Sequence, residues 1–308
     1  MSTKFKDNYI SLNLSFEKTM VFRLGVDSGF FSEYNNMVLA MLYCLKNHIK
    51  FTLSSRNSNL SNTGWNDFFV PFCPSNHISF HIKNNFRSHH TPSKRRNNLI
   101  KIYKFFTGKY LTQDFWNAFH SRAFEKEEFN IPSLQILGNT LSASQKLVAL
   151  TWNFNDVTKS RVNQIIVTVG LPKKYASIHI RRGDKAKEVD NLSVERYMEK
   201  LQHLTTIKDV FVATDDFTVI ELLTKIYTTH SFYHLTNGEA SGYDQMQFEN
   251  LNAESKKDEL LTLFATIEIL SVSEVFVGTF NSNIGMYMAM RLGTVNVYGV
   301  DFEDWRIW

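Results

Sequence analysis

Residues 176–185 read ASIHIRRGDK, an apolar run that ends in a dense group of charged side chains. From there to residue 298, short apolar runs alternate with amphipathic stretches. This alternation indicates an α/β fold with a doubly wound parallel sheet, whose ligands bind beyond the carboxyl ends of the strands. The spacing predicts strands at 176–180, 209–214, 232–235, 275–279 and 295–298, and helices at 193–204, 218–227, 256–270 and 282–292.

The pattern before residue 170 is less regular. An apolar run at 21–24, the turn at Gly29 and helical spacing at 37–45 predict a strand, a turn and a helix. Taking Gly170-Leu171-Pro172 as the boundary, we expect a partly irregular N-terminal α/β lobe, 1–170, and a Rossmann-like C-terminal lobe, 171–308. Other predictions are a strand at 51–53, a loop at 54–63 and helices at 112–128, 142–150 and 155–169, while 80–104 has no clear period.

Composition limits the class of protein. The chain is 43% hydrophobic and 14% aromatic, which is typical of a globular protein with a real core. Its formal charge of +4 is too small for a dedicated nucleic-acid binder. Cys44 and Cys73 have no C-x-x-C spacing, and no early apolar run is long enough for a signal core or a membrane span. We therefore expect a cytoplasmic protein with at most peripheral membrane contact.

The charges at the end of the first C-terminal strand favour an anion site. A departing diphosphate needs arginine forks, a lysine or a metal, and Arg181, Arg182 and Lys185 already supply positive charge. Strand alternation places His179 and Arg181 on one side. Two alternatives remain open. In the first, this is an edge strand whose charges reach solvent or pair with Asp184. In the second, Arg182 has a structural role and does not contact the anion.

Two further strand ends carry polar residues. The turn Thr279–Ser282 joins a strand to a helix, so its backbone N–H groups and the helix dipole would point at an anion. Ser282 could equally be an ordinary N-cap. Asp215 and Asp216 either cap the next helix or contact a donor, and their adjacency does not fit a metal-binding D-x-D motif.

Four ordered blocks of this sequence resemble the GDP-fucose fucosyltransferases, most closely the α-1,6-fucosyltransferases of the core-fucosylating and nodulation-factor types. Residues 179–185 are similar to the H-x-R-R-x-D-K motif of that family. The other blocks are 192–198, 212–216 and 277–282, in the family's order and with similar spacing. A thinner likeness runs from Gly29 through 34–36 to 64–69, where the family has a glycine loop and a G-W-x-x-x-F segment.

The resemblance implies a GT-B-like fold with two Rossmann-like lobes, the donor in the C-terminal lobe and the acceptor on the N-terminal side. It implies an inverting, α-1,6-like transfer of L-fucose from GDP-fucose to a glycan or glycoconjugate hydroxyl. Because Arg181 and Arg182 already supply positive charge, we expect no metal or other cofactor. We expect donor contacts from Gly29, His179, Arg181, Arg182, Lys185, Asp215, Asp216, Thr279, Asn281 and Ser282.

The transfer also needs a general base, because a sugar hydroxyl does not ionise at neutral pH. Asp184, Glu188 and Asp190 follow the strand. The family places its candidate glutamate shortly after the D-K pair, so Glu188 is the expected base. Asp184 is expected to orient Arg181 or Arg182, and Glu188 could instead be a solvated loop residue.

Some features depart from the family or admit other functions. Thr266 stands where the family has an aspartate, with Glu268 nearby, and Gly29 is what remains of the N-terminal glycine loop. An α-1,2-fucosyltransferase usually has an aromatic residue where this chain has Lys185, so this alternative is less favoured. A catalytically silent nucleotide-sugar or glycan-binding protein is the other alternative.

The segment around residue 90 offers two more candidates. Its histidines have no carboxylate partners at useful spacing, so we expect solvated loop residues in place of a metal cluster. The basic residues of the same region could attract an anionic acceptor, contact a membrane surface or simply be solvated. The histidines are His77, His81, His89 and His90, and the basic residues are Lys94, Arg95, Arg96, Lys101 and Lys104.

Overall fold

The structure is a computed structural model that describes residues 3–26, 28–87, 92–183 and 192–307. It divides into two compact units, Met1–Asn155 with Ile307–Trp308, and Asp156–Arg306. The helix α8 (Asp156–Thr168), which precedes the boundary expected at residue 170, groups with the second unit because it packs along α12 (Ala253–Ser271). Within the described ranges, no helix combines the length and apolarity that a membrane span requires.

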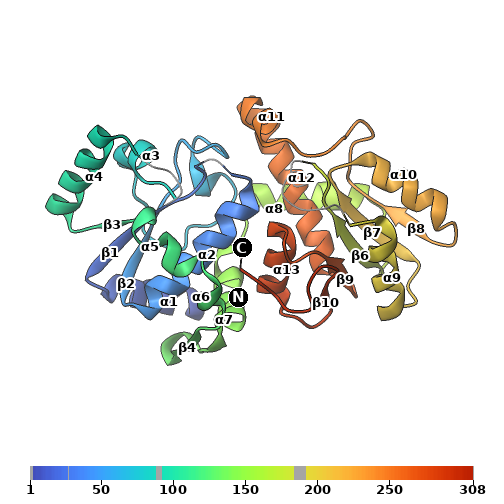
Figure 1. Cartoon of the computed structure of the whole chain (residues 1–308), viewed down its shortest axis with the longest axis horizontal. Coiled ribbons are helices and arrows are strands. Elements are labelled where there is room, and N and C mark those ends of the chain that lie inside the picture. Colours follow the sequence, from blue (N-terminus) through green and yellow to red (C-terminus); the bar gives the residue numbers. More distant parts are fainter. Residues whose placement is uncertain (1–2, 27, 88–91, 184–191, 308) are drawn as a thin grey trace. The chain divides into compact units, whose positions relative to one another are not determined.

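The second unit contains the predicted parallel sheet, in the order β10-β9-β6-β7-β8 (Figure 1). All its ladders are parallel, which confirms the alternation seen in the sequence, and the predicted bounds are correct to within three residues. The elements are β6 (Ala176–Ile180), α9 (Val194–Leu204), β7 (Asp209–Thr214), α10 (Phe217–Ile226), β8 (Ser231–Tyr233), α11 (Gln245–Asn250), α12, β9 (Phe276–Gly278), α13 (Asn283–Leu292) and β10 (Val297–Gly299).

Alternation along β6 separates the core from the site. Ile178 and Ile180 lie in the apolar cluster formed with α9 and α10, and both side chains are fully buried. Complete burial of one such side chain contributes about 1.5–3 kcal/mol. His179 points to the opposite face, as the alternation predicts. The apolar face fixes the register that presents the histidine.

The first unit has a smaller parallel sheet, β2-β1-β3, and the nearly completely buried helix α2. A two-stranded antiparallel sheet, β4-β5, lies apart from it. The elements are α1 (Thr3–Ser15), β1 (Lys18–Arg23), α2 (Phe30–Lys46), β2 (Ile49–Ser54), η1 (Gly64–Asp67), α3 (Phe80–Asn84), α4 (Lys94–Thr107), β3 (Tyr110–Leu111), α5 (Thr112–Phe119), α6 (Arg122–Glu125), β4 (Glu128–Ile131), η2 (Pro132–Leu134), β5 (Ile136–Asn139) and α7 (Thr140–Thr151).

The single helix predicted at 112–128 is wrong, because the chain forms α5, the short helix α6 and then strand β4. The hydroxyl of Ser121 accepts a hydrogen bond from the N–H of Phe124 at 3.4 Å, which starts a new helix after α5 ends. Glu128 pairs with Asn139 across the antiparallel ladder. Capping and strand pairing therefore interrupt a pattern that looks helical in sequence.

The expectation of solvated histidines is wrong for His81, which is fully buried in α3. Its Nε2 lies 3.1 Å from the hydroxyl of Tyr103, and its Nδ1 lies 3.4 Å from Nδ2 of Asn85. Burial lowers the pKa of His81 to about 4, so the ring is neutral at pH 7. His77 is exposed, and His89 and His90 lie outside the described residues.

Candidate functional site

The candidate site lies at the carboxyl ends of β6, β7 and β9. The register pairs His179 with Ala213 of β7, and places Gly278 of β9 on its other side. A Cβ added to Gly278 would come within 2.7 Å of the Phe276 ring and 3.7 Å of the His179 Cβ. The glycine therefore allows close packing beside the histidine.

His179 is a buried neutral side chain with an unsatisfied nitrogen. Its exposed fraction is 5%, and within the described residues its Nδ1 has no hydrogen-bond partner. Burial, assisted by the charge of Arg181 and opposed by Asp215, lowers the pKa of His179 to about 4. A buried polar atom without a partner is costly, so this nitrogen favours a ligand that can hydrogen-bond to it.

Acidification from about pH 7 to pH 4 is expected to destabilise the protein in part through His179. The pKa of about 4 in the fold lies below the ordinary value, so the unfolded chain takes up the proton first as the pH falls. The stability is fully present above about pH 6.5 and is lost toward pH 4, by about 3 kcal/mol. Urea titrations should show a smaller pH-dependent loss in His179→Gln than in wild type, and equal losses would contradict this.

Asp215 joins β7 to the end of β6 and to the loop before α11. Its Oδ1 accepts from the N–H of Arg182 at 2.8 Å, and its Oδ2 accepts from the N–H of Tyr243 at 3.1 Å. A Cβ on Gly183 would lie 2.4 Å from the carbonyl oxygen of Tyr243. The glycine of the R-R-G-D stretch thus permits this loop to close over the strand end.

The two arginines differ in their surroundings. Nη1 of Arg182 donates to the carbonyl oxygen of Leu192 at 2.7 Å, so this side chain braces the start of α9. The guanidinium carbon of Arg181 lies 5.1 Å from the ring centroid of Tyr243, within cation–π range. Sequence reasoning did not identify Tyr243. Gly242, with its left-handed φ of +108°, is the signal that marks this tight loop.

Asp216 caps α10, which is one of the two roles considered from sequence. Its Oδ1 accepts from the N–H of Thr218 at 2.9 Å and from the hydroxyl of the same residue at 2.7 Å. Adjacent aspartates therefore hold separate structural positions, one at the strand end and one at the helix start.

The turn after β9 already contains an internal anion. The N–H groups of Phe280 and Asn281 donate to the carboxylate of Asp301 at 2.8 and 2.9 Å. The expectation that these two amides point at a ligand is therefore wrong in this structure, because Asp301 satisfies them. Ser282 caps α13, accepting from the N–H of Gly285 at 3.0 Å and donating to the carbonyl of Thr279 at 2.9 Å.

Thr266 and Glu268 of α12, at and near the family's aspartate position, also have hydrogen-bond partners within this unit. Glu268 forms a bidentate ion pair with Arg291 of α13, at 2.7 and 3.1 Å. The hydroxyl of Thr266 donates to the carbonyl oxygen of Thr262 at 2.9 Å. The ion pair links α12 to α13, and the hydroxyl of Thr266 adds a hydrogen bond within α12.

The remaining expected site residues are not among those described at the end of β6. Gly29 precedes α2 in the first unit, where its carbonyl accepts from the N–H of Glu33 at 3.3 Å. Asp184, Lys185, Glu188 and Asp190 lie outside the described residues. Among those that are described, no three His, Cys, Asp or Glu side chains gather as they would to hold a metal ion.

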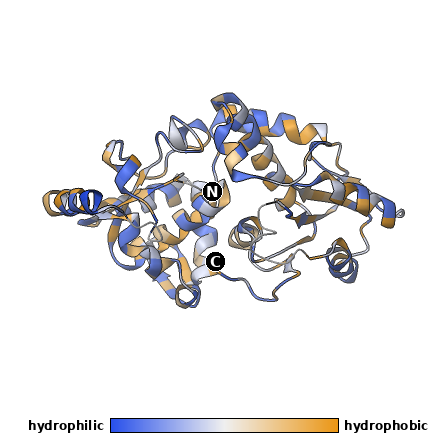
Figure 2. Ribbon diagram, turned by 45° about the horizontal axis from the view of Figure 1, so that its top comes forward, coloured by the Kyte–Doolittle hydropathy of each residue, from blue (hydrophilic) through white to orange (hydrophobic). Residues whose placement is uncertain are grey.

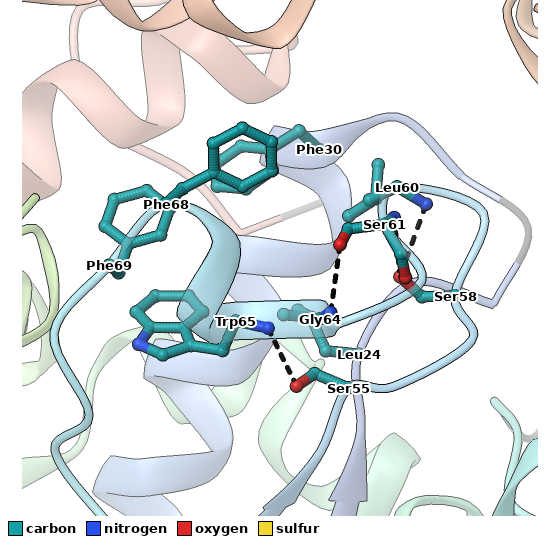
Figure 3. Close-up of a pocket in the computed structure, with 10 residues that line it drawn as sticks. All are labelled: Leu24, Phe30, Ser55, Ser58, Leu60, Ser61, Gly64, Trp65, Phe68 and Phe69. Carbon is teal, nitrogen blue, oxygen red and sulfur yellow. Dashed lines mark hydrogen bonds between the residues drawn. The ribbon is translucent and has the colours of Figure 1, made fainter. Parts of the chain in front are cut away.

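The pocket in Figure 3 belongs to the first unit and is too small for a substrate. Its volume of about 10 Å³ is near the minimum for one water molecule. A Cβ on Gly64 would lie 2.6 Å from the Ser55 backbone, and the ring of Trp65 stacks 4.4 Å from Phe69. The G-W segment of this chain therefore packs within the first unit.

Comparison with known proteins places these residues in context. Residues 142–294, about half of the chain, match the family described as alpha-(1,6)-fucosyltransferase N- and catalytic domains. No curated protein matches.

Solved structures share the fold. The NodZ alpha-1,6-fucosyltransferase soaked with GDP-fucose is 13% identical, with a TM-score of 0.54 over 92% of this chain and 93% of that chain. NodZ from Bradyrhizobium is 12% identical, with a TM-score of 0.54 and coverage of 92% and 94%. A mutant of Arabidopsis thaliana FUT1 in complex with GDP is 14% identical, with a TM-score of 0.53 over 96% of this chain and 74% of that chain. The predicted GT-B-like α/β fold is confirmed.

Proposed function

Because the chain is a glycosyltransferase of the GDP-fucose fucosyltransferase superfamily, most similar to the α-1,6-fucosyltransferases, we propose that it transfers L-fucose from GDP-fucose to a glycan hydroxyl. The proposed transfer proceeds with inversion and gives an α-1,6-like linkage. The observation that carries the proposal is Arg181 beside buried, neutral His179 at the end of β6. NodZ has been soaked with GDP-fucose and co-crystallised with GDP, which supports the choice of donor.

Arg181 supplies positive charge where the leaving group develops its own. Its guanidinium lies over the ring of Tyr243, and its planar fork can donate two hydrogen bonds to diphosphate oxygens. His179 is neutral and contributes a hydrogen bond in place of charge. Arg182 and Asp215 position this strand end through the backbone.

The proposed transfer needs a group that takes the proton of the acceptor hydroxyl. The acceptor oxygen attacks the anomeric carbon, the bond from that carbon to the diphosphate oxygen breaks, and the acceptor proton goes to a carboxylate. We assign that carboxylate to Glu188, which follows β6 in the sequence but lies outside the described residues.

We assign the donor to the second unit and the acceptor to the N-terminal half. We also propose a cytoplasmic enzyme, whose two cysteines are unpaired.

GDP and GDP-fucose are expected to bind without divalent metal. Arg181 at the end of β6 supplies a cationic hydrogen-bond donor, and Lys185, four residues later in the sequence, is expected to add a second, which is the charge that a metal would otherwise provide. Calorimetry in the presence of EDTA should give the same GDP affinity as calorimetry without it. If EDTA abolishes binding and magnesium or manganese restores it, binding of the donor depends on a metal ion and this prediction is wrong.

An acceptor array with labelled GDP-fucose tests the proposed activity. Label on an acceptor, followed by linkage analysis, distinguishes an α-1,6 product from the α-1,2 product of the rival enzyme. Hydrolysis of GDP-fucose without acceptor separates an enzyme from a silent binder. Binding of GDP-fucose with neither transfer nor hydrolysis would contradict the proposal.

A further inference from the structure

Helix α4 presents an unusually apolar outer face. The exposed fractions are 49% for Leu99, 54% for Ile102, 84% for Phe105 and 79% for Phe106. These residues recur at spacings of three and four, so they form one stripe along the helix. Figure 2 colours α4 in alternating hydrophobic and hydrophilic bands. Scattered exposed apolar residues are ordinary, but a contiguous stripe marks an interaction surface.

The opposite side of α4 is what holds the helix to the first unit. Ile100 is the one buried residue of α4, all of which the structure describes, and it packs with Phe86. Arg96 lies over the Phe86 ring at 4.6 Å, and Tyr103 stacks on Phe80 at 4.1 Å. The stripe therefore faces outward because the other face is already occupied.

Positive charge surrounds the stripe. Residues 94–107 contain Lys94, Arg95, Arg96, Lys101 and Lys104 and no acidic residue. Lys104 pairs with Asp114 at 2.7 Å. A shallow groove of about 540 Å³ between α3 and α4 is lined by Ile82, Lys83, Asn84, Ser93, Arg95, Arg96 and Leu99.

We propose that α4 docks the protein on an anionic lipid bilayer, lying in the plane of the surface with Phe105 and Phe106 inserted among the acyl chains. Cations flanking exposed aromatic and aliphatic side chains are the composition of an interfacial helix. A two-fold contact with a second copy would place the five basic residues of each helix against each other, which disfavours self-association. A glycan would need hydrogen-bonding groups along the stripe, where the side chains are apolar.

Vesicle sedimentation tests the docking. Full-length protein should bind vesicles of phosphatidylcholine containing about one third phosphatidylglycerol, bind phosphatidylcholine alone at least about tenfold more weakly, and dissociate at high salt. The double variant Phe105→Ser/Phe106→Ser should lose about tenfold or more in affinity. The charge reversal Lys94→Glu/Lys101→Glu should do the same while retaining the apolar stripe.

Matched variants on α8 give the control. Val157 and Val167 are 66% and 79% exposed, and Lys159 is exposed on the same helix. Val157→Ser/Val167→Ser and Lys159→Glu should bind the anionic vesicles as wild type does. GDP affinity should be unchanged in every variant, which checks folding. No binding by wild type, equal loss in the α8 variants, or a dimer in light scattering that Phe105→Ser/Phe106→Ser dissolves would overturn the proposal.

Discussion

Replacing Glu188 by glutamine is expected to leave GDP affinity within a few-fold of wild type and to reduce fucose transfer by roughly 100- to 10,000-fold. Glutamine preserves the size of the side chain but cannot accept the acceptor's proton. Because the base acts on the acceptor and not on the nucleotide, binding and turnover should separate. Calorimetry with GDP and a transfer assay with labelled donor measure the two quantities.

The other two acids of the segment provide the control. Asp184 follows Arg181 and Arg182 after the single residue Gly183, and the charge of the arginines would make its carboxylate a weaker base. Asp190 stands close to the start of α9. Asp190→Asn should retain most of the transfer rate. If Glu188→Gln keeps its activity while Asp184→Asn or Asp190→Asn loses it, the base is that residue.

Arg181→Ala is expected to reduce donor turnover by about 30- to 1,000-fold, which corresponds to about 2–4 kcal/mol. The change removes a charge-assisted contact to the leaving diphosphate. Arg182→Ala is a useful comparison, because the Arg182 side chain donates to the Leu192 carbonyl. Its effect should appear in the free energy of unfolding as well as in turnover.

Arg181→Lys distinguishes geometry from charge. A lysine keeps the positive charge but offers a point ammonium in place of a planar fork, so it should restore little of the lost rate. It would also weaken the cation–π contact with Tyr243. Near wild-type rates in both Arg181 variants would make the arginine structural and move the donor site elsewhere.

The fold of the second unit was predictable because its pattern is local. Apolar runs and helical periods repeat along the chain, and right-handed crossovers leave few ways to arrange them. The close packing of Gly183 against Tyr243 depends on residues about sixty positions apart, so spacing along the strand could not show it. The same is true of Asp301, which follows the last strand and binds amides of the turn after β9.

The first unit was harder to predict for a different reason. The ring of His81 contacts Tyr103 of α4, 22 residues further along the chain, as well as the neighbouring Asn85, and spacing alone does not show the first of these contacts. The break between α5 and α6 depends on a serine cap and on the pairing of β4 with β5. Tertiary contacts therefore override local propensity here. The general base stays a prediction, because Glu188 lies outside the described residues.

Calorimetric titration of GDP-fucose into wild type, Arg181→Ala and the exposed-site control Arg56→Ala tests the central claim most directly. The account predicts saturable binding to wild type and to Arg56→Ala with equal affinity, and a loss of at least about 30-fold in Arg181→Ala. No binding of GDP-fucose by wild type, or the same affinity in all three proteins, would contradict the donor site at the end of β6.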